Sequence, residues 1–409
     1  MDQLTVDVLR SAIQGQAAAF RCRRRLQPAG GSGDKVFPPT FAGAVYAIER
    51  RRVPGKDEPV NCVLLDSVQS QANRMELALQ EAVDAGRIKL PLVVVDFSDY
   101  DPTGDVDADG AAGRLIDKVG RITSLQVPHR LADAILRDSE LDGTRFRKSD
   151  RGKALNSVNA QNATPLFELC PTALIFGMWD STGPKGGLGP KFERAMVSEI
   201  VGIGAQWEEG YRNRGVRRDP LEISKNVPVF GDEYGALQRI AEPGEKKAIR
   251  PSEINHSSVP FESPNSGVTV EYAEQTTTLS LICLRRLRFP LSGKTDPEVD
   301  AAAQTVLAAL GLTAATLAFE AGTDLRSRCL LWPDGPMVWE LLDRPGEEPR
   351  RFSLAGDAAV GLLRGAVEAA RQTGLEWPEE PLVLKPSEEL VKLVRLSQLE
   401  NARKPAEVA

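Results

Sequence analysis

A buried strand that turns directly into a helix is the feature that most constrains the fold of this chain. Residues 63–65 are apolar, and a helical pattern over 69–85 follows almost at once. Within that helix Met75, Leu79 and Val83 are spaced to form one apolar stripe. An apolar stripe has to be buried against another layer of the structure. The junction therefore predicts that this helix docks on a sheet.

The first turns of the same helix carry polar side chains that suit a polyanionic backbone. Gln69 and Asn73 are four residues apart, as are Ser70 and Arg74, so each pair shares a stretch of helix surface. Amides and hydroxyls hydrogen-bond phosphate and sugar oxygens, a helix N-terminus favours negative charge, and an arginine forks onto phosphate. The alternative is a capped helix with a solvated polar face, and these residues taken alone favour it.

Strands and helices are mixed along the rest of the chain. Strands are predicted at 41–51, 61–65, within 87–99, at 171–181, 267–290, 324–333 and 337–343. Helices are predicted at 4–13, after Pro128, at 192–205 (alone or with a strand), 297–321 with an interruption at Gly311, 355–374 and 387–404. There is neither a regular βα alternation nor an internal repeat. This mixture favours an α+β sheet with insertions over a doubly wound fold.

Charge limits the kind of nucleic-acid site that the chain can carry. The net charge is −6, so an RNA site would have to be a local basic strip on an acidic protein. Basic clusters occur at Arg21 with Arg23–Arg25, at 144–153, at Arg212, Arg214, Arg217 and Arg218, and at Arg285, Arg286 and Arg288. Each cluster taken alone could be a solvated face.

The last of these clusters follows the strongest strand signal in the chain. On a strand, Arg286 and Arg288 would flank Leu287 and project to one sheet face. Basic residues on an open sheet face suit single-stranded RNA. Aromatic residues make up only 6% of the chain, so binding should rest on phosphate and sugar contacts, with little sequence preference.

A glycine-rich segment at 181–192 matches neither common phosphate-binding pattern. Gly189 is followed by Pro190, and Phe192 takes the position of the last glycine in a dinucleotide fingerprint. What remains is backbone that can approach an RNA strand or a neighbouring subunit, flanked by Lys185 and Lys191. The alternative is a mobile surface turn.

Catalytic and metal sites are not expected. His129 with Asp133 could form a base and its orienter, but no nucleophile accompanies them, and His256 has no companion ligands. The aspartates of 99–109 break the calcium-loop pattern because the glutamate that this pattern requires is missing. That loop is predicted to be an exposed acidic turn. We therefore predict no enzyme activity, no metal and no cofactor.

The expected location is the cytoplasm. The five cysteines are scattered and include no CxxC pair, which fits a reducing compartment. The N-terminus does not read as a signal peptide, and no uninterrupted apolar run reaches the roughly 18 residues of a spanning helix. No membrane partner is expected.

Three long motifs together resemble a known family. They are LLDSVQSQANRME at 64–76, SLQVPHRLADAILRDS at 124–139 and PTALIFGMWDSTGPKGGLGPKFERAMVSEIVG at 171–202. They look like the backbone subunit of type I CRISPR surveillance complexes (Cascade), in the subtype now lettered G and formerly U. That family belongs to the repeat-associated RNA-binding (RAMP) superfamily, built on an RRM-like, ferredoxin-like palm. Weaker similarity continues at 284–290 and 325–333.

This resemblance implies an antiviral ribonucleoprotein role. Copies would polymerise head to tail along the spacer of a CRISPR RNA, together with other subunits, and target DNA would be read by guide pairing. The implied domain is a single palm over 1–385 with insertions around 99–113, 144–162 and 207–268, followed by a helical tail at 386–409. A thumb that kinks the guide is implied within 144–162 or 207–268.

The candidate guide contacts follow from the resemblance and the basic clusters. They are Gln69, Ser70, Asn73, Arg74, Arg24, Lys185, Lys191, Arg286 and Arg288. One rival is a metal-dependent ribonuclease of the same superfamily that uses a loop aspartate such as Asp99, Asp101 or Asp105. A second rival is a protein-only scaffold whose arginine clusters bind acidic neighbours.

Overall fold

The structure is a computed structural model that falls into two compact units. It describes residues 1–42, 45–183, 186–207, 216–217, 219–224, 226–232, 235–242, 244–256, 259–260 and 267–403. The first unit comprises 1–101, 119–206 and 267–390, and the second comprises 102–118, 207–266 and 391–409. Each unit is described by itself below.

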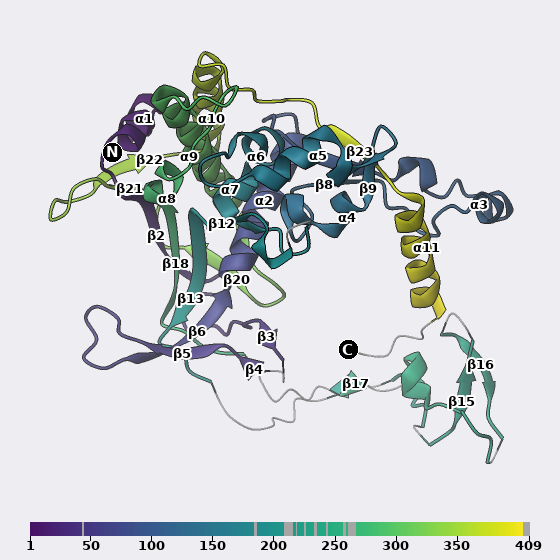
Figure 1. The fold of residues 1–409 in the computed structure, drawn as a ribbon. Helices are drawn as coiled ribbons and strands as arrows, with labels where there is room; N and C mark the ends of the chain where they lie inside the picture. Colours follow the sequence, from purple (N-terminus) through teal and green to yellow (C-terminus); the bar gives the residue numbers. More distant parts are fainter. Residues whose placement is uncertain are drawn as a thin grey trace. The chain divides into compact units, whose positions relative to one another are not determined.

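Four antiparallel strands and two helices form the centre of the first unit. In chain order they are β2 (Ala19–Pro28), α2 (Val68–Asp84), β13 (Met196–Ile203), β18 (Tyr272–Ser280), α9 (Pro297–Glu320) and β21 (Trp339–Leu342). Their order across the sheet is β21-β2-β18-β13, and every neighbouring pair is antiparallel. A βαββαβ chain with its last strand beside its first is the ferredoxin-like arrangement. The predicted α+β palm with insertions is confirmed (Figure 1).

Further strands extend this sheet to ten. They are β6 (Val60–Asp66) and β5 (Ile48–Arg51) beyond β13, β22 (Arg350–Ser353) and β1 (Asp2–Gln3) beyond β21, and β20 (Leu330–Pro333) with β19 (Thr323–Asp324) beside β2. The buried strand that precedes α2 in sequence is thus a member of the same sheet as β2. Helix α2 contacts both β13 and α9. The predicted stripe is confirmed at Met75 and Leu79, which are buried.

Helix α9 is the core of the first unit. Its 24 residues run without a break, so the predicted interruption at Gly311 is wrong. A Cβ at Gly311 would lie 3.3 Å from the Met196 Cε and 3.4 Å from the Leu279 Cδ1. The glycine is therefore used for close packing of α9 on β13 and β18, and it does not end the helix.

Helix α9 is also long and apolar enough to cross a membrane by length and composition alone, although polar residues such as Gln304 and Thr305 interrupt its apolar run. In the structure, 89% of its most apolar window is buried inside the protein. Helices α1 (Val6–Gln14), α8 (Leu281–Arg285) and α10 (Gly356–Arg371) pack against it. This burial is that of a core helix in a globular fold.

A second, five-stranded sheet completes the first unit. Its strands, in spatial order, are β10 (Thr144–Arg145), β9 (Ser139–Leu141), β23 (Leu382–Pro386), β7 (Val93–Asp96) and β8 (Arg121–Thr123). Short elements around it are the 3₁₀ helices η1 (Ser98–Tyr100), η2 (Arg130–Ala132), η3 (Phe146–Lys148) and η4 (Leu155–Ser157), with α4 (Ala134–Arg137), α5 (Asp150–Ala154) and α6 (Thr164–Leu169).

Several local predictions differ from the structure. Segment 144–162, predicted to be a projecting loop or an irregular insertion, does not project as a whole, because Phe146, Leu155 and Val158 are buried. Residues predicted as the strand 171–181 form α7 (Thr172–Phe176) and the short β11 (Met178–Trp179), which pairs with β12 (Lys191–Phe192). A continuous apolar run cannot distinguish a buried strand from a buried helix. The helix predicted after Pro128 is short and consists of η2 and α4. Of the helix or helix–strand pair predicted at 192–205, the structure has the strand, at 196–203.

The second unit holds the large insertion and the acidic loop. It contains α3 (Val106–Ala112), the antiparallel pair of β14 (Val216–Arg217) with β17 (Val259–Pro260), the hairpin of β15 (Val229–Gly231) with β16 (Leu237–Ile240), and η6 (Pro251–Ile254). The tail helix α11 (Glu388–Arg403) enters it at residue 391. The remaining elements, in the first unit, are β3 (Thr40–Phe41), β4 (Val45–Tyr46) and η5 (Gly186–Leu188).

Candidate nucleic-acid interface

A buried carboxylate organises the N-terminus of α2. Asp66 ends β6, is only 1% exposed, and accepts hydrogen bonds from Ser70 Oγ at 2.8 Å and Gln71 Nε2 at 2.6 Å. Arg74 Nε donates to the same carboxylate at 3.0 Å. The predicted guide contacts Ser70 and Arg74 therefore turn polar groups inward, toward the protein.

Arg74 also ties α2 to the segment that follows α9. Its two terminal nitrogens donate to the carbonyl oxygens of Asp324 at 3.3 Å and Leu325 at 2.8 Å. Gln69 and Asn73, one helical turn apart, are exposed, and Leu77 beyond them is 56% exposed. The outward face of α2 is thus formed by Gln69, Asn73 and Leu77, and Arg74 mainly supports the fold.

A chain of buried polar groups leads from Asp66 to Arg24. Gln71 Oε1 accepts from Gln275 Nε2 at 2.8 Å, and Gln275 Oε1 accepts from Arg24 Nη1 at 3.2 Å. Arg24 is 8% exposed, its guanidinium lies 4.8 Å from the centre of the Phe319 ring, and burial lowers its pKa. The structure therefore places Arg24 on the helix-covered side of β2, away from the open face of the sheet.

The other side of β2 presents Arg23 and Arg25, which belong to a predicted basic cluster but were not among the candidate guide contacts. Arg23 and Arg25 alternate with buried residues, so both project from the face that the helices do not cover. Arg23 pairs with Glu274 on β18 at 2.7 Å and keeps 49% of its side chain exposed. Arg25 lies over the ring of Tyr272 at 3.8 Å.

A tryptophan on β20 adds a second flat ring to this face. Trp332 is paired in register with Gln27 on β2 and is 71% exposed. Arg23, Arg25, Tyr272 and Trp332 are called the open-face strip below. Cations and aromatic rings on one groove or sheet are what single-stranded nucleic acids bind, by phosphate contact and by base stacking.

The sequence contained enough information to predict which side of β2 each arginine faces. Phe20, Cys22 and Leu26 are apolar at even positions of β2 and are buried, which puts Arg24 inside and its two neighbours outside. Trp332 gave no comparable signal, because its exposure depends on pairing between β2 and β20, which are distant in sequence.

The glycine-rich segment is a turn built around Asp180. Arg147 forms an ion pair with this carboxylate, which is buried. A Cβ at Gly183 would meet the Asp180 carboxylate, and a Cβ at Gly189 would meet the Asp180 carbonyl oxygen. The glycines are thus required by close packing within the turn.

Of the two lysines predicted as contacts in this segment, the structure describes one. Lys191 lies on β12 with its Nζ 5.3 Å from the ring centre of Trp179, which is 52% exposed. Lys185 lies outside the described residues. Of the predicted insertion cluster, Arg212, Arg214 and Arg218 also lie outside them.

Arg286 and Arg288 do not project from a strand. Strand β18 ends at Ser280, which caps α8, and both arginines follow this helix, so the predicted strand alternation is wrong here. Arg286 is exposed and pairs with Glu193 at 3.3 Å. Arg288 donates to the carbonyl of Arg285 at 2.7 Å and pairs with Asp300 of α9 at 3.4 Å. Their contact with RNA stays a prediction, but the argument that they project from an open sheet face no longer supports it.

The aspartates of the acidic loop hold the backbone in place. Asp101 accepts from the amides of Val119 and Gly120, Asp105 caps α3, and Asp99 pairs with Lys385 at 2.5 Å. A hydrogen bond from the Thr103 hydroxyl, together with amide donors, lowers the pKa of Asp109. Across the described part of the chain, no group of three or more His, Cys, Asp or Glu residues is arranged to hold a metal.

The other chemical candidates have structural partners as well. Asp133 accepts from the His129 amide at 3.2 Å and caps α4 through the Ile135 amide, so the carboxylate is used on the backbone and His129 is exposed. All five cysteines are free thiols. Burial raises the pKa of the Cys22 thiol to about 11 and also raises the pKa values of the other four.

A buried ion pair fixes the other end of the exposed face of α2. Arg130 forks onto Glu76 with distances of 2.7 and 2.8 Å and donates to the Gly177 carbonyl at 2.9 Å. Both residues are at least nine-tenths buried, and burial raises the pKa of Glu76 although Arg130 opposes this shift. Sequence reasoning missed this pair because its members are 54 residues apart.

Comparison with known families gives a match for part of the chain. Residues 20–207 match the family model described as CRISPR-associated protein GSU0053 (Cas_GSU0053). The matched stretch is 188 of the 409 residues and includes β2, α2, the glycine-rich segment and β13. No curated protein matches the chain. The likeness of this stretch to a CRISPR-associated family supports a function in a CRISPR system.

Proposed function

We propose that this chain is a guide-binding backbone subunit of a type I CRISPR surveillance complex in the cytoplasm, of the subtype lettered G. Copies of it polymerise head to tail along the spacer of a CRISPR RNA, together with other subunits. Target DNA is recognised by pairing with the guide, because a protein that makes no hydrogen bond to the pairing edges of the bases leaves those edges free to pair.

The open-face strip is the observation that carries this proposal. Its two arginines are two residues apart on one face of β2, so their Cα atoms are about 7 Å apart along the strand. Arg23 and Arg25 supply phosphate contacts, and Tyr272 and Trp332 supply rings on which bases can stack. The ferredoxin-like palm and the match to a CRISPR-associated family agree with this role.

Gln69 and Asn73 extend the proposed guide path beyond the strip. Both are exposed at the N-terminal end of α2, where amides can bond sugar and phosphate oxygens. Ser70 and Arg74 act in this proposal by fixing the start of α2 through Asp66. Lys191 beside Trp179 is a further cation with an adjacent ring.

We propose no catalytic step for the chain. The ribonuclease alternative is not favoured, because the carboxylates of Asp99, Asp101 and Asp105 are engaged with Lys385, with backbone amides and with the α3 cap. A magnesium-dependent cleavage assay on the assembled complex decides this question, and cleavage that is lost in Asp101→Ala would overturn the non-catalytic assignment.

RNA binding can be measured directly by anisotropy of a labelled guide RNA over a salt series. Removing one phosphate contact should weaken binding and reduce the slope of log K against log salt by about 0.7 for a single strand. The double variant Arg23→Ala/Arg25→Ala should therefore bind at least tenfold more weakly with a flatter slope. Arg344→Ala is the matched control, since this arginine is 70% exposed in a loop and pairs only within that loop.

Equal affinity and equal salt slope in the double variant and the control would remove the open-face strip from the guide path. Trp332→Ala separates stacking from charge, because it should weaken binding without a change in the salt slope.

A further inference from the structure

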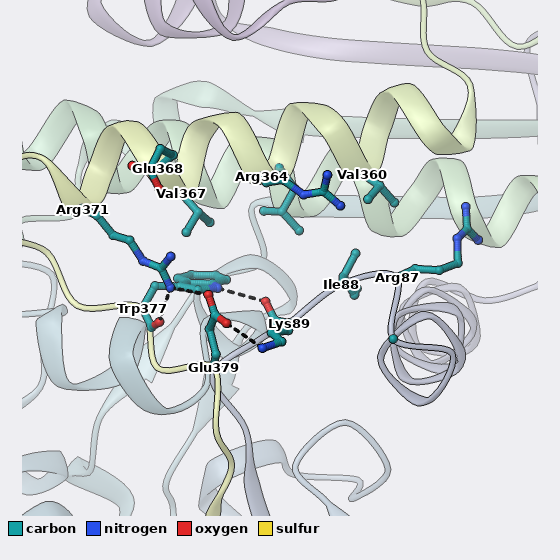
Figure 2. A pocket seen from close by; sticks show the side chains of 12 residues that line it. Arg87, Ile88, Lys89, Val360, Arg364, Val367, Glu368, Arg371, Trp377 and Glu379 are labelled. Atoms are coloured by element: carbon teal, nitrogen blue, oxygen red, sulfur yellow. Dashed lines mark hydrogen bonds and ion pairs between the residues drawn. The ribbon is translucent and has the colours of Figure 1, made fainter.

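A groove of about 390 Å³ runs along α10 in the first unit. One wall is α10 and the other is the segment 86–89 that follows α2 (Figure 2). Its floor is apolar and consists of Ile88, Val360, Leu363, Val367 and Trp377, all of which are less than one-tenth exposed. This space is called the α10 groove below. Its size is that of a binding cavity, and its apolar floor suits an occupant with apolar side chains.

The rim of the α10 groove is basic, although the whole protein is acidic. Its lining residues include four cations, Arg87, Lys89, Arg364 and Arg371, and two carboxylates, Glu368 and Glu379, and Arg87 also pairs with Asp357 at 3.1 Å. Figure 2 shows Arg364 and Arg371 on α10, with Lys89 and Arg87 opposite. Glu379 closes one end by pairing with Lys89 at 2.9 Å and Arg371 at 2.6 Å. The occupant should therefore carry acidic groups beside its apolar ones.

Trp377 favours a polypeptide over a nucleic acid as the occupant. Its indole N–H donates to the Lys89 carbonyl at 3.0 Å, and its ring meets Phe167 edge to face at 5.2 Å. Only 6% of this residue is exposed, so no ring face is available for base stacking.

Helix α11 carries a stripe with the complementary chemistry. Glu389, Leu393, Leu396 and Glu400 follow one another at spacings of four, three and four residues, which places them on one helix face. Leu393 and Leu396 are 62% and 63% exposed, and both glutamates are exposed. Glu389 pairs with Arg145 at 3.0 Å. This ion pair is exposed, so replacing it with a pair to a cation of another copy costs little free energy.

We propose that α11 of one copy of the chain docks in the α10 groove of the next copy. Leu393 and Leu396 enter the apolar floor, and the two glutamates meet the basic rim. The lengths agree, because Glu389–Glu400 and Val360–Arg371 each span eleven helical steps, about 16 Å. The inference rests on the self-assembly in the proposed function and names the two surfaces that perform it.

Such a contact is heterologous, since it joins two different surfaces. Repetition of it therefore continues from copy to copy and does not close into a symmetric dimer. A single helix in a groove is a small interface and is expected to be weak in free solution. Copies held on one guide RNA have a high effective concentration, so a weak contact suffices there.

Photocrosslinking on guide RNA tests the docking. Leu396 is replaced by the photoreactive residue p-benzoylphenylalanine, and ¹⁵N-labelled protein is mixed with unlabelled protein before illumination. The proposal predicts crosslinked peptides of mixed isotope content that join residue 396 to 86–89 or 360–371. Crosslinks confined to one copy, to RNA or to other surfaces would overturn it.

Paired variants give an independent test by light scattering on guide RNA. Arg87→Glu/Arg364→Glu impairs the groove, and Leu393→Gln/Leu396→Gln impairs the helix. Each double variant alone should weaken the contact between neighbouring copies at least tenfold and abolish cooperative loading on the RNA. In a mixture of the two variants, pairwise contact should return, because the groove variant has an intact α11 and the helix variant has an intact α10 groove. Arg344→Glu is the matched charge-reversal control at an exposed site elsewhere, since this side chain is 70% exposed.

The results separate this inference from the proposed function. If the wild type assembles on guide RNA and both double variants assemble equally well, only the docking is wrong. If the wild type neither binds RNA nor assembles, the proposed function itself fails and the docking fails with it.

Discussion

Asp66 and Glu76 are buried carboxylates on either side of the first turns of α2, and each is satisfied by arginine. Arg74 and Arg326 approach Asp66, and Arg130 forks onto Glu76. The sequence predicted that the polar residues of 69–76 begin a helix. It did not predict which of their side chains point into the protein and which point to solvent. Their direction depends on partners such as Arg326 and Arg130 that lie far away in the chain.

The Glu76–Arg130 pair should contribute strongly to stability when one partner is removed. Glu76→Gln leaves a buried guanidinium without its counter-charge, and the expected loss is about 3–5 kcal/mol of unfolding free energy. Urea denaturation measures it, with Glu81→Gln on the exposed side of the same helix as the control. The double variant Glu76→Met/Arg130→Met should recover much of the loss, because neither charge is then buried. A loss below about 1 kcal/mol for Glu76→Gln would contradict this assignment.

Thiol reactivity should follow burial. A thiol with a pKa of about 11, as at Cys22, is roughly 0.1% thiolate at pH 8, and its labelling should rise with pH toward that value. In the native protein we expect Cys283, which is partly exposed, to react first with a disulfide reagent, and all five thiols to react after denaturation. Rapid labelling of Cys22 at pH 8, located by mass spectrometry, would contradict the described burial.

Helices and strands were predictable where apolar residues recur with a clear period. The prediction was wrong where a short apolar run had to be assigned to a helix or a strand. The pattern of α2, and the apolar positions of β2, are readable because a buried face repeats at the period of the element. Residues 172–176 are buried on every side, so they carry no period, and their helix was taken for a strand. In 144–162, three buried apolar residues are spread among charged ones and anchor the segment. The composition of the segment does not show that they are buried.

Two glycines in helices should respond oppositely to substitution. Gly361 lies in α10 with open space where an added methyl group would go, so Gly361→Ala should raise stability by up to about 1 kcal/mol. Gly311 faces Met196 and Leu279 at 3.3–3.4 Å, so Gly311→Val should cost about 1–3 kcal/mol through overpacking. Thermal unfolding of both variants measures this. A stabilising Gly311→Val would show that α9 does not pack closely on β13 and β18.

The order of strands across the sheet was outside the reach of sequence patterns. Strand β2 pairs with β18, β20 and β21, which all come from the second half of the chain, and such long-range pairing leaves no local signal. The ferredoxin-like palm was expected from the resemblance alone, and the open-face strip emerges only once this order is known. The net charge of −6 excludes a uniformly basic surface, so an RNA site on this chain stays a prediction of a local group of cations.

The measurement we would make first is the mass and content of the particle purified after co-expression with a CRISPR array and partner subunits. Light scattering during size-exclusion chromatography gives the mass, and extraction gives the length of any bound RNA. The proposed function predicts a particle holding several copies of the chain on RNA of one defined length, and loss of that RNA in Arg23→Ala/Arg25→Ala. An RNA-free monomer from the wild type, with partners present, would contradict it.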